Sequence, residues 1–262
     1  MNYLKKMYSF RNILWELSVN DFKNKFAGSY LGVIWAFAQP VVVVSIYWLI
    51  FEKGLKAQPM DNFSYLLWLI AGICPWFYIN EALNSASNSM VEYSYIVKKV
   101  KFQMELIPLI KVISAMFVHA FFVFLVLAIY MANGIKLTLC TVQVLYYSFA
   151  AMMLAVGISY IISAVNVFFR DTAQIVAILL QYGMWLVPIM IGENQYPEIL
   201  SKFMKFNPVY YLVEGYRDSL IRGRWFWERP VLSVYFWLVV ILVFLIGIRL
   251  FRKLKIHFAD VL

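Results

Sequence analysis

The sequence has few charged residues, few histidines and few cysteines. Charged side chains make up 14% of its 262 residues, whereas a soluble domain carries about a quarter. The two histidines, His119 and His257, and the two cysteines, Cys74 and Cys140, form no metal-ligand or disulfide pattern. There is no HExxH or GxSxG motif, and no glycine is followed by lysine, which excludes a phosphate-binding P-loop. The sequence therefore predicts no metal site, no catalytic residue and no cofactor bound by this chain.

What the chain has instead is long uncharged runs. Apolar residues make up 63% of the sequence, and six windows contain no Asp, Glu, Lys or Arg: Phe26–Phe51, Asn62–Asn80, Val112–Ile135, Leu137–Phe169, Thr172–Gly192 and Pro230–Ile248. A helix rises about 1.5 Å per residue, so about 20 apolar residues cross the hydrocarbon core of a bilayer. We therefore predict an all-α polytopic membrane protein of one domain, 1–262, with six transmembrane helices at 30–51, 63–84, 107–131, 141–165, 172–192 and 230–250.

The distribution of Lys and Arg predicts the orientation of these spans. A net charge of +9 could indicate nucleic acid, but basic residues of a membrane protein set its topology and contact anionic headgroups. Membrane lipids, and no nucleic acid, are therefore the expected partners of these charges. Six spans place both termini on one side, which carries thirteen Lys and Arg against nine on the other. The positive-inside rule then puts both termini in the cytoplasm.

Residues 1–26 precede the first span and have an amphipathic pattern. Two apolar stripes lie on neighbouring helical faces: Phe10, Ile13, Leu14 and Leu17 form one, and Trp15, Val19, Phe22 and Phe26 form the other. Charged residues lie between the stripes. We predict an N-terminal amphipathic helix in the membrane interface. The alternative, a frayed basic tail, would leave these apolar side chains in water.

Residues 193–229, between the fifth and sixth predicted spans, combine eleven charges with many aromatic side chains. Pro197, Pro208 and Pro230 divide this stretch into short segments. We predict two short amphipathic or re-entrant helices at the outer interface, because aromatic residues at this density are costly to leave in water. The alternative is an ordinary solvated loop.

Two polar residues of the third predicted span are candidates for a functional role. Lys111 lies near its inner end and can extend its ammonium group to the interface. His119 lies near the middle and must face protein or water, so we expect it to hydrogen-bond a neighbouring helix. Pro40, Pro75 and Pro188 are expected to kink or loosen the first, second and fifth spans.

Five segments carry recognisable motifs in a fixed order. They are Asp21–Pro40 (DFKNKFAGSYLGVIWAFAQP), Pro75-Trp-Phe followed by Lys98–Pro108, Asn166–Asp171 (NVFFRD), Asn207–Tyr211 (NPVYY) with Glu214–Asp218 (EGYRD), and the tail Phe258–Leu262 (FADVL). Together they resemble the membrane subunits of type-2 ABC exporters of lipid-linked polysaccharides, the permeases of O-antigen, capsule and teichoic-acid export. One departure is Gln103, where the family usually has a proline before the glutamate.

The resemblance implies a half-transporter in the bacterial cytoplasmic (inner) membrane. Such a permease forms a homodimer with a second copy of itself and binds two copies of a separate ABC ATPase subunit, which holds ATP and Mg²⁺. The missing P-loop agrees with this division of labour. The loop after the second span resembles the ATPase-coupling segment, with contacts expected from Tyr95, Val97, Lys98, Lys99, Lys101, Phe102 and Glu105. The alternative is that its lysines only fix topology.

Four further groups of residues receive expected roles. The substrate entrance would include Lys23, Lys25, Tyr30 and Trp35, with the two lysines as candidates to hold a pyrophosphate. Tyr47 and Trp185 are channel candidates, because aromatic faces suit the C–H groups of sugars. The inner turn joining the fourth and fifth spans contains Asn166, Arg170 and Asp171, and we expect Arg170 and Asp171 to cap a helix or pair. The outer gate, 193–229, would include Asn207, Pro208, Tyr210, Tyr211, Glu214 and Arg217.

The predicted function is the membrane-spanning permease of ATP-driven export of a lipid-linked polysaccharide such as an O-antigen or teichoic acid; the chain by itself is not an enzyme. A small-molecule or drug ABC exporter permease is the first alternative, and the absence of a large extracellular domain and the polysaccharide-type tail argue against it. A membrane-embedded glycosyl- or acyltransferase acting on lipid-linked sugars is the second. It would need a cluster of catalytic acids at one interface, and the sequence has none.

Overall fold

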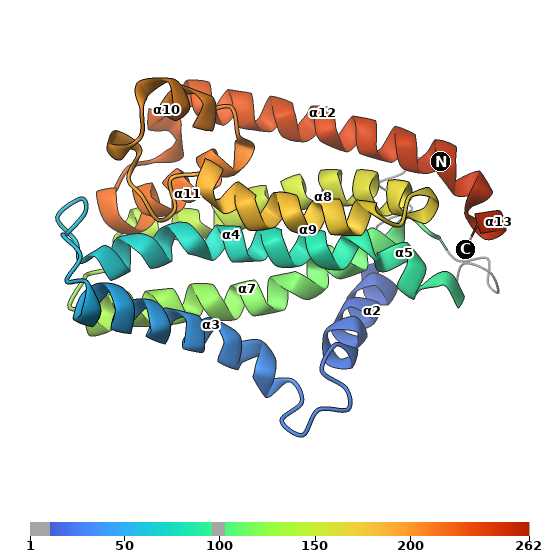
Figure 1. The fold of residues 1–262 in the computed structure, drawn as a ribbon, viewed down its shortest axis with the longest axis horizontal. Helices are drawn as coiled ribbons and strands as arrows, with labels where there is room; N and C mark the ends of the chain where they lie inside the picture. The colour runs from blue at the N-terminus through green and yellow to red at the C-terminus, as the bar shows by residue number, and fades with distance from the viewer. Residues whose placement is uncertain (1–10, 96–102, 262) are drawn as a thin grey trace.

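The computed structural model describes residues 11–95 and 103–261, and it is a bundle of long helices. Figure 1 shows the long helices running along the long axis of the molecule: α3 (Ile34–Tyr47), α4 (Tyr65–Ser87), α7 (Leu106–Ala132), α8 (Gln143–Phe168), α9 (Thr172–Gly183) and α12 (Pro230–Leu254). Outside helices and turns, the described residues contain one isolated β-bridge, between Met60 and Phe63. The all-helical expectation is confirmed for this part of the chain.

Among the described residues, five helices are long and apolar enough to cross a membrane. They are Ile34–Gly54, where α3 continues into the π-helical η1 (Trp48–Gly54); Tyr65–Ser87; Leu106–Ala132; Leu139–Phe168, where η2 (Leu139–Val142) precedes α8; and Pro230–His257, where η7 (Lys255–His257) extends α12. Each overlaps one of the predicted spans. The chain is a multi-pass membrane protein.

The helix at the fifth predicted position, 172–192, is shorter than expected. α9 has 12 residues, and η3 (Met184–Leu186) adds three before the helix stops. Pro188 explains the end, because proline disfavours helical backbone at the residue before it, and Val187 is extended at φ −137° and ψ 142°. A helix of this length rises about 22 Å, less than the roughly 30 Å of a hydrocarbon core. Beyond it the chain continues through a connection in which Val187 and Ile189 are fully buried.

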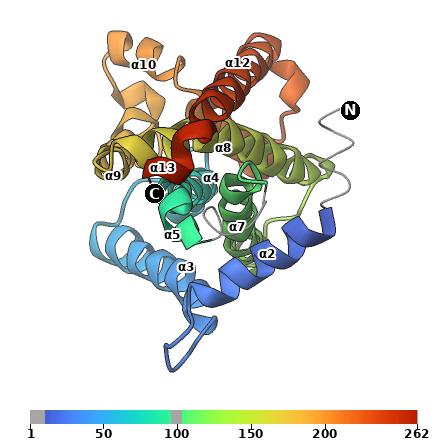
Figure 2. The ribbon, with the colours of Figure 1, turned by 90° about the vertical axis from the view of Figure 1, so that its right-hand side faces the viewer.

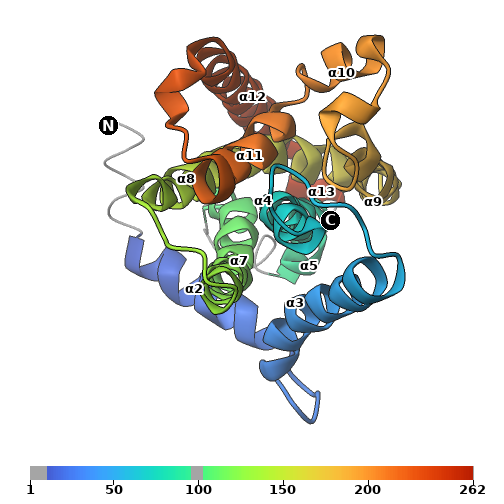
Figure 3. The ribbon, with the colours of Figure 1, turned by 90° about the vertical axis from the view of Figure 1, so that its left-hand side faces the viewer.

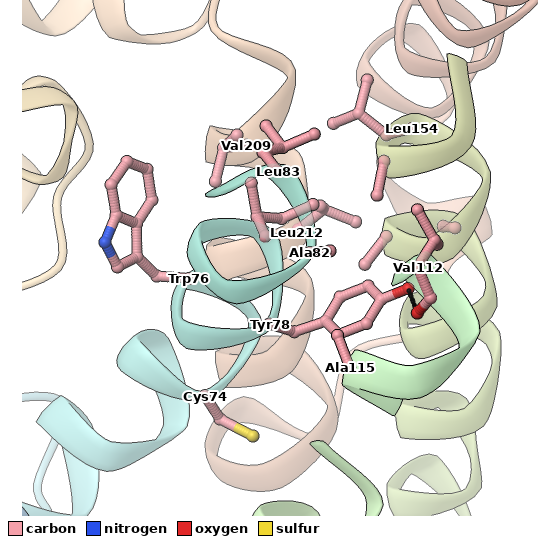
Figure 4. Packing of buried hydrophobic residues seen from close by; sticks show 14 of the residues in the cluster. Cys74, Trp76, Tyr78, Ala82, Leu83, Val112, Ala115, Leu154, Val209 and Leu212 are labelled. Atoms are coloured by element: carbon pink, nitrogen blue, oxygen red, sulfur yellow. Dashed lines mark hydrogen bonds between the residues drawn. The ribbon is translucent and has the colours of Figure 1, made fainter. Parts of the chain in front are cut away.

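α4 is the central helix of the bundle. Of the residues in its most apolar 18-residue stretch, 83% are buried. The corresponding share is 17% for the α3–η1 helix and 22% for the α12–η7 helix. Apolar residues all round a helix suit such a central position. Figure 4 shows Tyr78 pointing from α4 toward α7, where its hydroxyl donates to the carbonyl of Val112 at 3.3 Å, while Trp76 points to the opposite side.

Two glycines bring α8 and α12 into close contact. A Cβ added at Gly247 would lie 2.6 Å from the carbonyl oxygen of Gly157, and one added at Gly157 would lie 3.0 Å from the amide of Phe244. Small residues commonly allow such backbone approach between helices in membranes. The outward side of α12 carries exposed apolar residues such as Leu238 and Leu242, as expected for a lipid-facing surface.

The two ends of the bundle carry different short elements. α2 (Arg11–Asn24) crosses the bundle axis at one end, which also holds α5 (Ser89–Glu92) and α13 (Phe258–Val261) (Figures 1 and 2). We call this the inner end. The opposite, outer end holds α10 (Glu198–Met204) and α11 (Pro208–Arg217), with η4 (Glu193–Gln195), η5 (Asp218–Arg222) and η6 (Phe226–Glu228) (Figure 3).

The described part of the predicted interface helix is α2. Trp15 and Phe22 place their rings 5.3 and 5.4 Å from that of Phe117 on α7, so part of the apolar surface of α2 packs on the bundle. Ile13 stays exposed on another side. Turns follow α2 and lead into α3, with Gly28 at a φ of +85°, a backbone conformation that favours glycine.

Candidate functional site

A partly buried cluster of charges joins three elements at the inner end. The Nζ of Lys111, on α7, lies 2.8 Å from Oδ1 of Asp21 on α2 and 2.5 Å from Oε2 of Glu92 on α5. The hydroxyl of Tyr93 donates to the same oxygen of Asp21 at 2.9 Å. Lys111 is only 9% exposed. Instead of extending alone to the interface, as the sequence suggested, Lys111 ties the interface helix to the bundle.

A cavity of about 390 Å³ lies beside this cluster, between α2, α4 and α7. Its walls carry Asp21, Lys25, Glu81, Glu92 and Lys111, together with the hydroxyls of Ser85 and Ser114. Three carboxylates therefore face two ammonium groups. We call this space the inner cavity.

A second cavity, of about 380 Å³, adjoins the first and lies between α3, α4, α7 and α9. It is lined largely by rings, those of Phe26, Tyr47, Trp76, Phe77, Tyr78 and Phe122, with polar groups from Gln39, Asn80 and Gln181 among them. Lys25, Glu81, Ala115 and Val118 line both cavities. We call this space the aromatic cavity. The two cavities thus adjoin at these four residues.

The structure brings one of the four predicted entrance residues to these cavities. Lys25 forms an ion pair with Glu81 where the two cavities meet. Lys23 is exposed on α2, Tyr30 is fully exposed in the turns after it, and Trp35 is 51% exposed on α3. A phosphate at Lys25 would have to compete with the carboxylate of Glu81.

Of the two channel candidates, one lies at the aromatic cavity and the other does not. Tyr47 lines the aromatic cavity, whereas Trp185 is 51% exposed at the outer end of α9, where its carbonyl accepts a bond from Tyr196 at 3.5 Å. Four other rings of this cavity, those of Trp76, Phe77, Tyr78 and Phe122, were not among the channel candidates chosen from the sequence. The Pro75-Trp-Phe motif already marked two of them, because it places Trp76 and Phe77 on α4.

Most of the predicted coupling segment lies outside the described residues: Val97, Lys98, Lys99, Lys101 and Phe102. Tyr95, at the start of the segment, is exposed at the inner end. Glu105, at its end, binds Nζ of Lys255 at 2.5 Å. Burial alone would raise the pKa of Glu105, but the hydrogen bond and charge of Lys255, with the charge of Arg252, lower it below the usual value. Glu105 is thus a carboxylate tied to the C-terminal segment.

The inner turn between α8 and α9 is organised by Asn166. Its Oδ1 accepts the amide of Ala173 in the first turn of α9 at 3.1 Å, and its Nδ2 donates to Oδ1 of Asn88 at 3.4 Å. Asp171 occupies the N-cap position but makes no side-chain cap bond, and Arg170 is exposed beside it. The cap that we expected from Arg170 or Asp171 is therefore supplied by Asn166, because its buried amide reaches the helix start from α8.

At the outer end, the predicted gate residues lie on or next to α11. Asn207 caps this helix by accepting the amide of Val209 at 3.0 Å, and Pro208 occupies its first turn. All residues from Val209 to Arg217 are buried, Tyr210, Tyr211, Glu214 and Arg217 among them. α11 is thus enclosed by the bundle rather than lying on the interface. It is a buried helix whose polar residues face other protein groups.

Those polar residues form a charge network. Glu214 binds Arg217 at 2.9 Å and Arg222 at 2.5 Å, and Asp218 binds Arg222 at 3.1 Å. Two partners come from other segments: Asp61 lies 2.8 Å from Arg222, and Arg229 lies 2.9 Å from Asp218. Three carboxylates thus balance three guanidinium groups, as burial of charge requires. Asp61, Asp218, Arg222 and Arg229 were absent from the sequence-based selection, because no local pattern places Asp61 beside a residue 161 positions away.

α10 is attached through Glu193. Its carboxylate accepts from Tyr210 at 2.6 Å and from Ser201 at 2.7 Å, and it lies 2.8 Å from Nζ of Lys205. Burial alone would raise the pKa of Glu193, but these partners lower it. Ile199 and Phe203 on α10, and Phe206 just after it, are exposed. The two outer helices thus differ sharply in burial.

His119 behaves as the sequence predicted. Its Nε2 lies 2.8 Å from the hydroxyl of Tyr216 on α11 and 3.1 Å from that of Ser148 on α8. It therefore joins three elements in the middle of the bundle. The ring also borders the aromatic cavity.

The sequence of the chain is similar to those of several known proteins. The chain is 26% identical over 252 residues to the O-antigen export system permease protein RfbA of Klebsiella pneumoniae, across 96% of this chain and 95% of that protein. It is 24% identical over 233 residues to the RfbA protein of Myxococcus xanthus, with 88% of each chain covered. It is 23% identical over 242 residues to the polysialic acid transport protein KpsM of Escherichia coli, covering 90% and 91%. The family model for the ABC-2 type transporter matches residues 13–221, so the chain belongs to the ABC-2 type transporter family.

Proposed function

We propose that the chain is the membrane-spanning permease of an ATP-driven exporter that moves a lipid-linked polysaccharide out across the cytoplasmic membrane of a bacterium. The observation that carries this proposal is the pair of adjoining cavities behind the interface helix. Hydroxyl-bearing and charged side chains line the first, and aromatic rings line the second. Sugars present hydroxyl edges and C–H faces, so both kinds of wall suit them. The O-antigen and polysialic acid transport proteins that resemble the chain support the same substrate class.

The topology follows from the two ends of the bundle. α2, α5 and α13 share the inner end, where the basic residues around Lys25 and Lys255 belong in the cytoplasm by the positive-inside rule. α9, although short, completes a sixth crossing together with the buried connection 187–190. Non-helical backbone at membrane depth is tolerated where protein covers it, and Val187 and Ile189 are fully buried.

A second copy of the chain supplies the other wall of the pathway. The aromatic cavity opens between α3 and α9 and contains Gln39, Asn80 and Gln181, which are costly to expose to lipid. α9 also bears exposed apolar residues on its other sides, among them Ile178 and Leu179. A homodimer that packs the α3 and α9 sides of two copies together encloses the cavity and covers these residues. Two copies of a separate ATPase, holding ATP and Mg²⁺, dock at the inner end around residues 95–105.

The test uses the chain with its cognate ATPase in proteoliposomes. We expect ATP-dependent transfer of a lipid-linked glycan, and no ATP hydrolysis by the chain alone. Replacing Val97–Phe102 by a Gly/Ser stretch should abolish ATPase binding and export together. Robust hydrolysis by the isolated chain would sink the half-transporter assignment, and unchanged ATPase binding by the Gly/Ser variant would sink the coupling assignment.

A small-molecule exporter permease is the second candidate, because an aromatic cavity of about 380 Å³ also accommodates a drug-sized apolar ligand. The same vesicles distinguish the two. Export of apolar dyes without any transfer of lipid-linked glycan would favour the second candidate.

A further inference from the structure

Arg217 is the most enclosed charged residue among those described, with an exposed fraction of 0%. Its guanidinium carbon lies 3.4 Å from the ring centroid of Trp68 on α4. Gly72, one turn further along α4, makes room for it, because a Cβ there would lie 2.6 Å from Nη2. The central helix therefore contains a socket for this one side chain.

The guanidinium also binds the connection that follows α9. Nη1 donates to the carbonyl of Pro188 at 2.5 Å, and Nη2 donates to that of Ile189 at 2.9 Å. The next carbonyl, that of Met190, accepts the hydroxyl of Tyr65 on α4 at 2.5 Å. Because the helix has already ended, these carbonyls have no helical partners, and side chains from α11 and α4 supply the missing donors. α4, α11 and the outer end of α9 are thereby joined at one point.

Other contacts hold α11 equally firmly. The hydroxyl of Tyr216 binds His119 and Ser148, and that of Tyr211 lies 3.0 Å from both Tyr146 and Ser233. Gly215 faces the ring of Tyr147 so closely that a Cβ would lie 2.1 Å from it. Moving α11 would break many buried polar bonds at once.

α10 has no comparable support. Met204 is its one buried residue, and its polar ties run through Glu193, which is partly exposed. Figure 3 shows α11 across the middle of the outer end and α10 set to one side of it. Regions that open locally have few buried contacts and many exposed groups, and α10 fits that description.

We propose that Arg217 is the positioning residue of the outer gate: it fixes α11 and the connection 187–190 to α4 as a rigid frame, so that the exit opens by displacement of α10 alone. This inference rests on the proposed export function. It narrows the predicted gate, 193–229, to its first third and assigns α11 a static role.

The experiment measures cysteine reactivity in the membrane-embedded complex with its ATPase. Cys74 and Cys140 are both buried and are replaced by alanine, and single cysteines are then introduced. Met204→Cys reports on the contact beneath α10, and Ile189→Cys reports on the frame. Ala164→Cys, buried at the inner half of α8, controls for general loosening. The probe is a membrane-impermeant maleimide, applied with and without ATP turnover.

With Arg217 intact, we expect turnover to raise labelling of Met204→Cys about tenfold and to leave Ile189→Cys protected, since labelling follows the population of the opened state. Arg217→Gln should expose Ile189→Cys by a similar factor, lower export per ATP hydrolysed, and leave Ala164→Cys protected. Arg217→Lys keeps the charge but loses the planar guanidinium group. Its labelling of Ile189→Cys should lie between that of the protein with Arg217 and that of Arg217→Gln. Arg224→Gln, at an exposed arginine of the same end, should match the parent protein.

Two outcomes would overturn the proposal. The first is labelling of Ile189→Cys during turnover in the presence of Arg217, which would show that the frame itself moves. The second is an Arg217→Gln protein with unchanged protection and unchanged export. If Arg217→Gln does not fold, the labelling of Met204→Cys and Ile189→Cys in the presence of Arg217 still tests the proposal. Absence of glycan transfer by the parent complex would count against the proposed function instead, because the labelling comparison requires only ATP turnover.

Discussion

At the scale of single residues, the buried charges described in this protein are partnered side chains. Lys111 and Arg217 are both nearly or fully buried, and each binds groups from at least two other elements. Ionisable residues at membrane depth are costly, so such pairs are expected wherever they occur. Their cost makes each of them a sensitive point for mutation.

Replacing Lys111 by methionine removes the cation that neutralises Asp21 and Glu92. Breaking a buried ion pair by removing one partner costs about 3–5 kcal/mol, and we expect the lower end because Glu92 is half exposed. Lys111→Arg, which keeps the charge, is the control. Thermal unfolding in lipid nanodiscs measures both, and equal midpoints for the two variants would show that the cluster contributes no stability.

Gly72→Ala tests the socket for Arg217. The added Cβ would lie 2.6 Å from Nη2 and 3.0 Å from Cζ, so we expect a loss of about 1–3 kcal/mol from overpacking. Gly54→Ala is the matched control, since its Cβ would meet only the carbonyl of Leu49 at 3.4 Å. In an Arg217→Gln background the cost of Gly72→Ala should shrink, and a fully additive double-mutant cycle would argue against this contact.

At the scale of elements, helix ends decide where each segment stops and turns. Pro188 ends the fifth helix early, Asn207 and Pro208 start α11, and Asn166 starts α9 from a neighbouring helix. The first two were visible as proline positions in the sequence. The third was not, because the cap comes from α8, outside the turn that it caps.

Asn166→Ala should therefore destabilise the start of α9. Loss of a cap costs about 0.5–2 kcal/mol, and the bond to Asn88 is lost as well. Asp171→Ala, at the N-cap position itself, should have little effect because its side chain makes no cap bond. Unfolding midpoints of the two variants give the comparison, and the reverse order would return the capping role to Asp171.

At the scale of the whole molecule, the proposed homodimer would place a second copy against the cavities and the exposed apolar residues of α3 and α9. A cysteine at Leu179 on α9, 65% exposed, should form disulfide-linked dimers under mild oxidation in the membrane. Leu238→Cys on α12 is equally apolar and 61% exposed, but it faces lipid and should remain monomeric. Non-reducing electrophoresis measures the fraction of disulfide-linked dimer for both variants. Cross-linking at Leu238 alone would place the dimer interface on α12.

The sequence by itself determined the helical class, five of the long helices and the family. Local composition suffices for the helices, because a bilayer selects any uncharged run of sufficient length. The family came from the resemblance of five motifs in a fixed order. It also predicted that His119 would bond a neighbouring helix. It overestimated the length of the fifth helix, because it treated Pro188 as a kink and not as an end.

Only the tertiary structure decided how the charges are used. The run from Glu214 to Asp218 reads as the polar face of an interfacial helix, yet the fold turns that face inward, against Trp68, Pro188 and Asp61. Such pairings depend on segments far apart in the chain and leave no periodic trace. The physical reason is that a span is a property of one segment in contact with lipid, whereas a buried ion pair is a property of two segments brought together by packing.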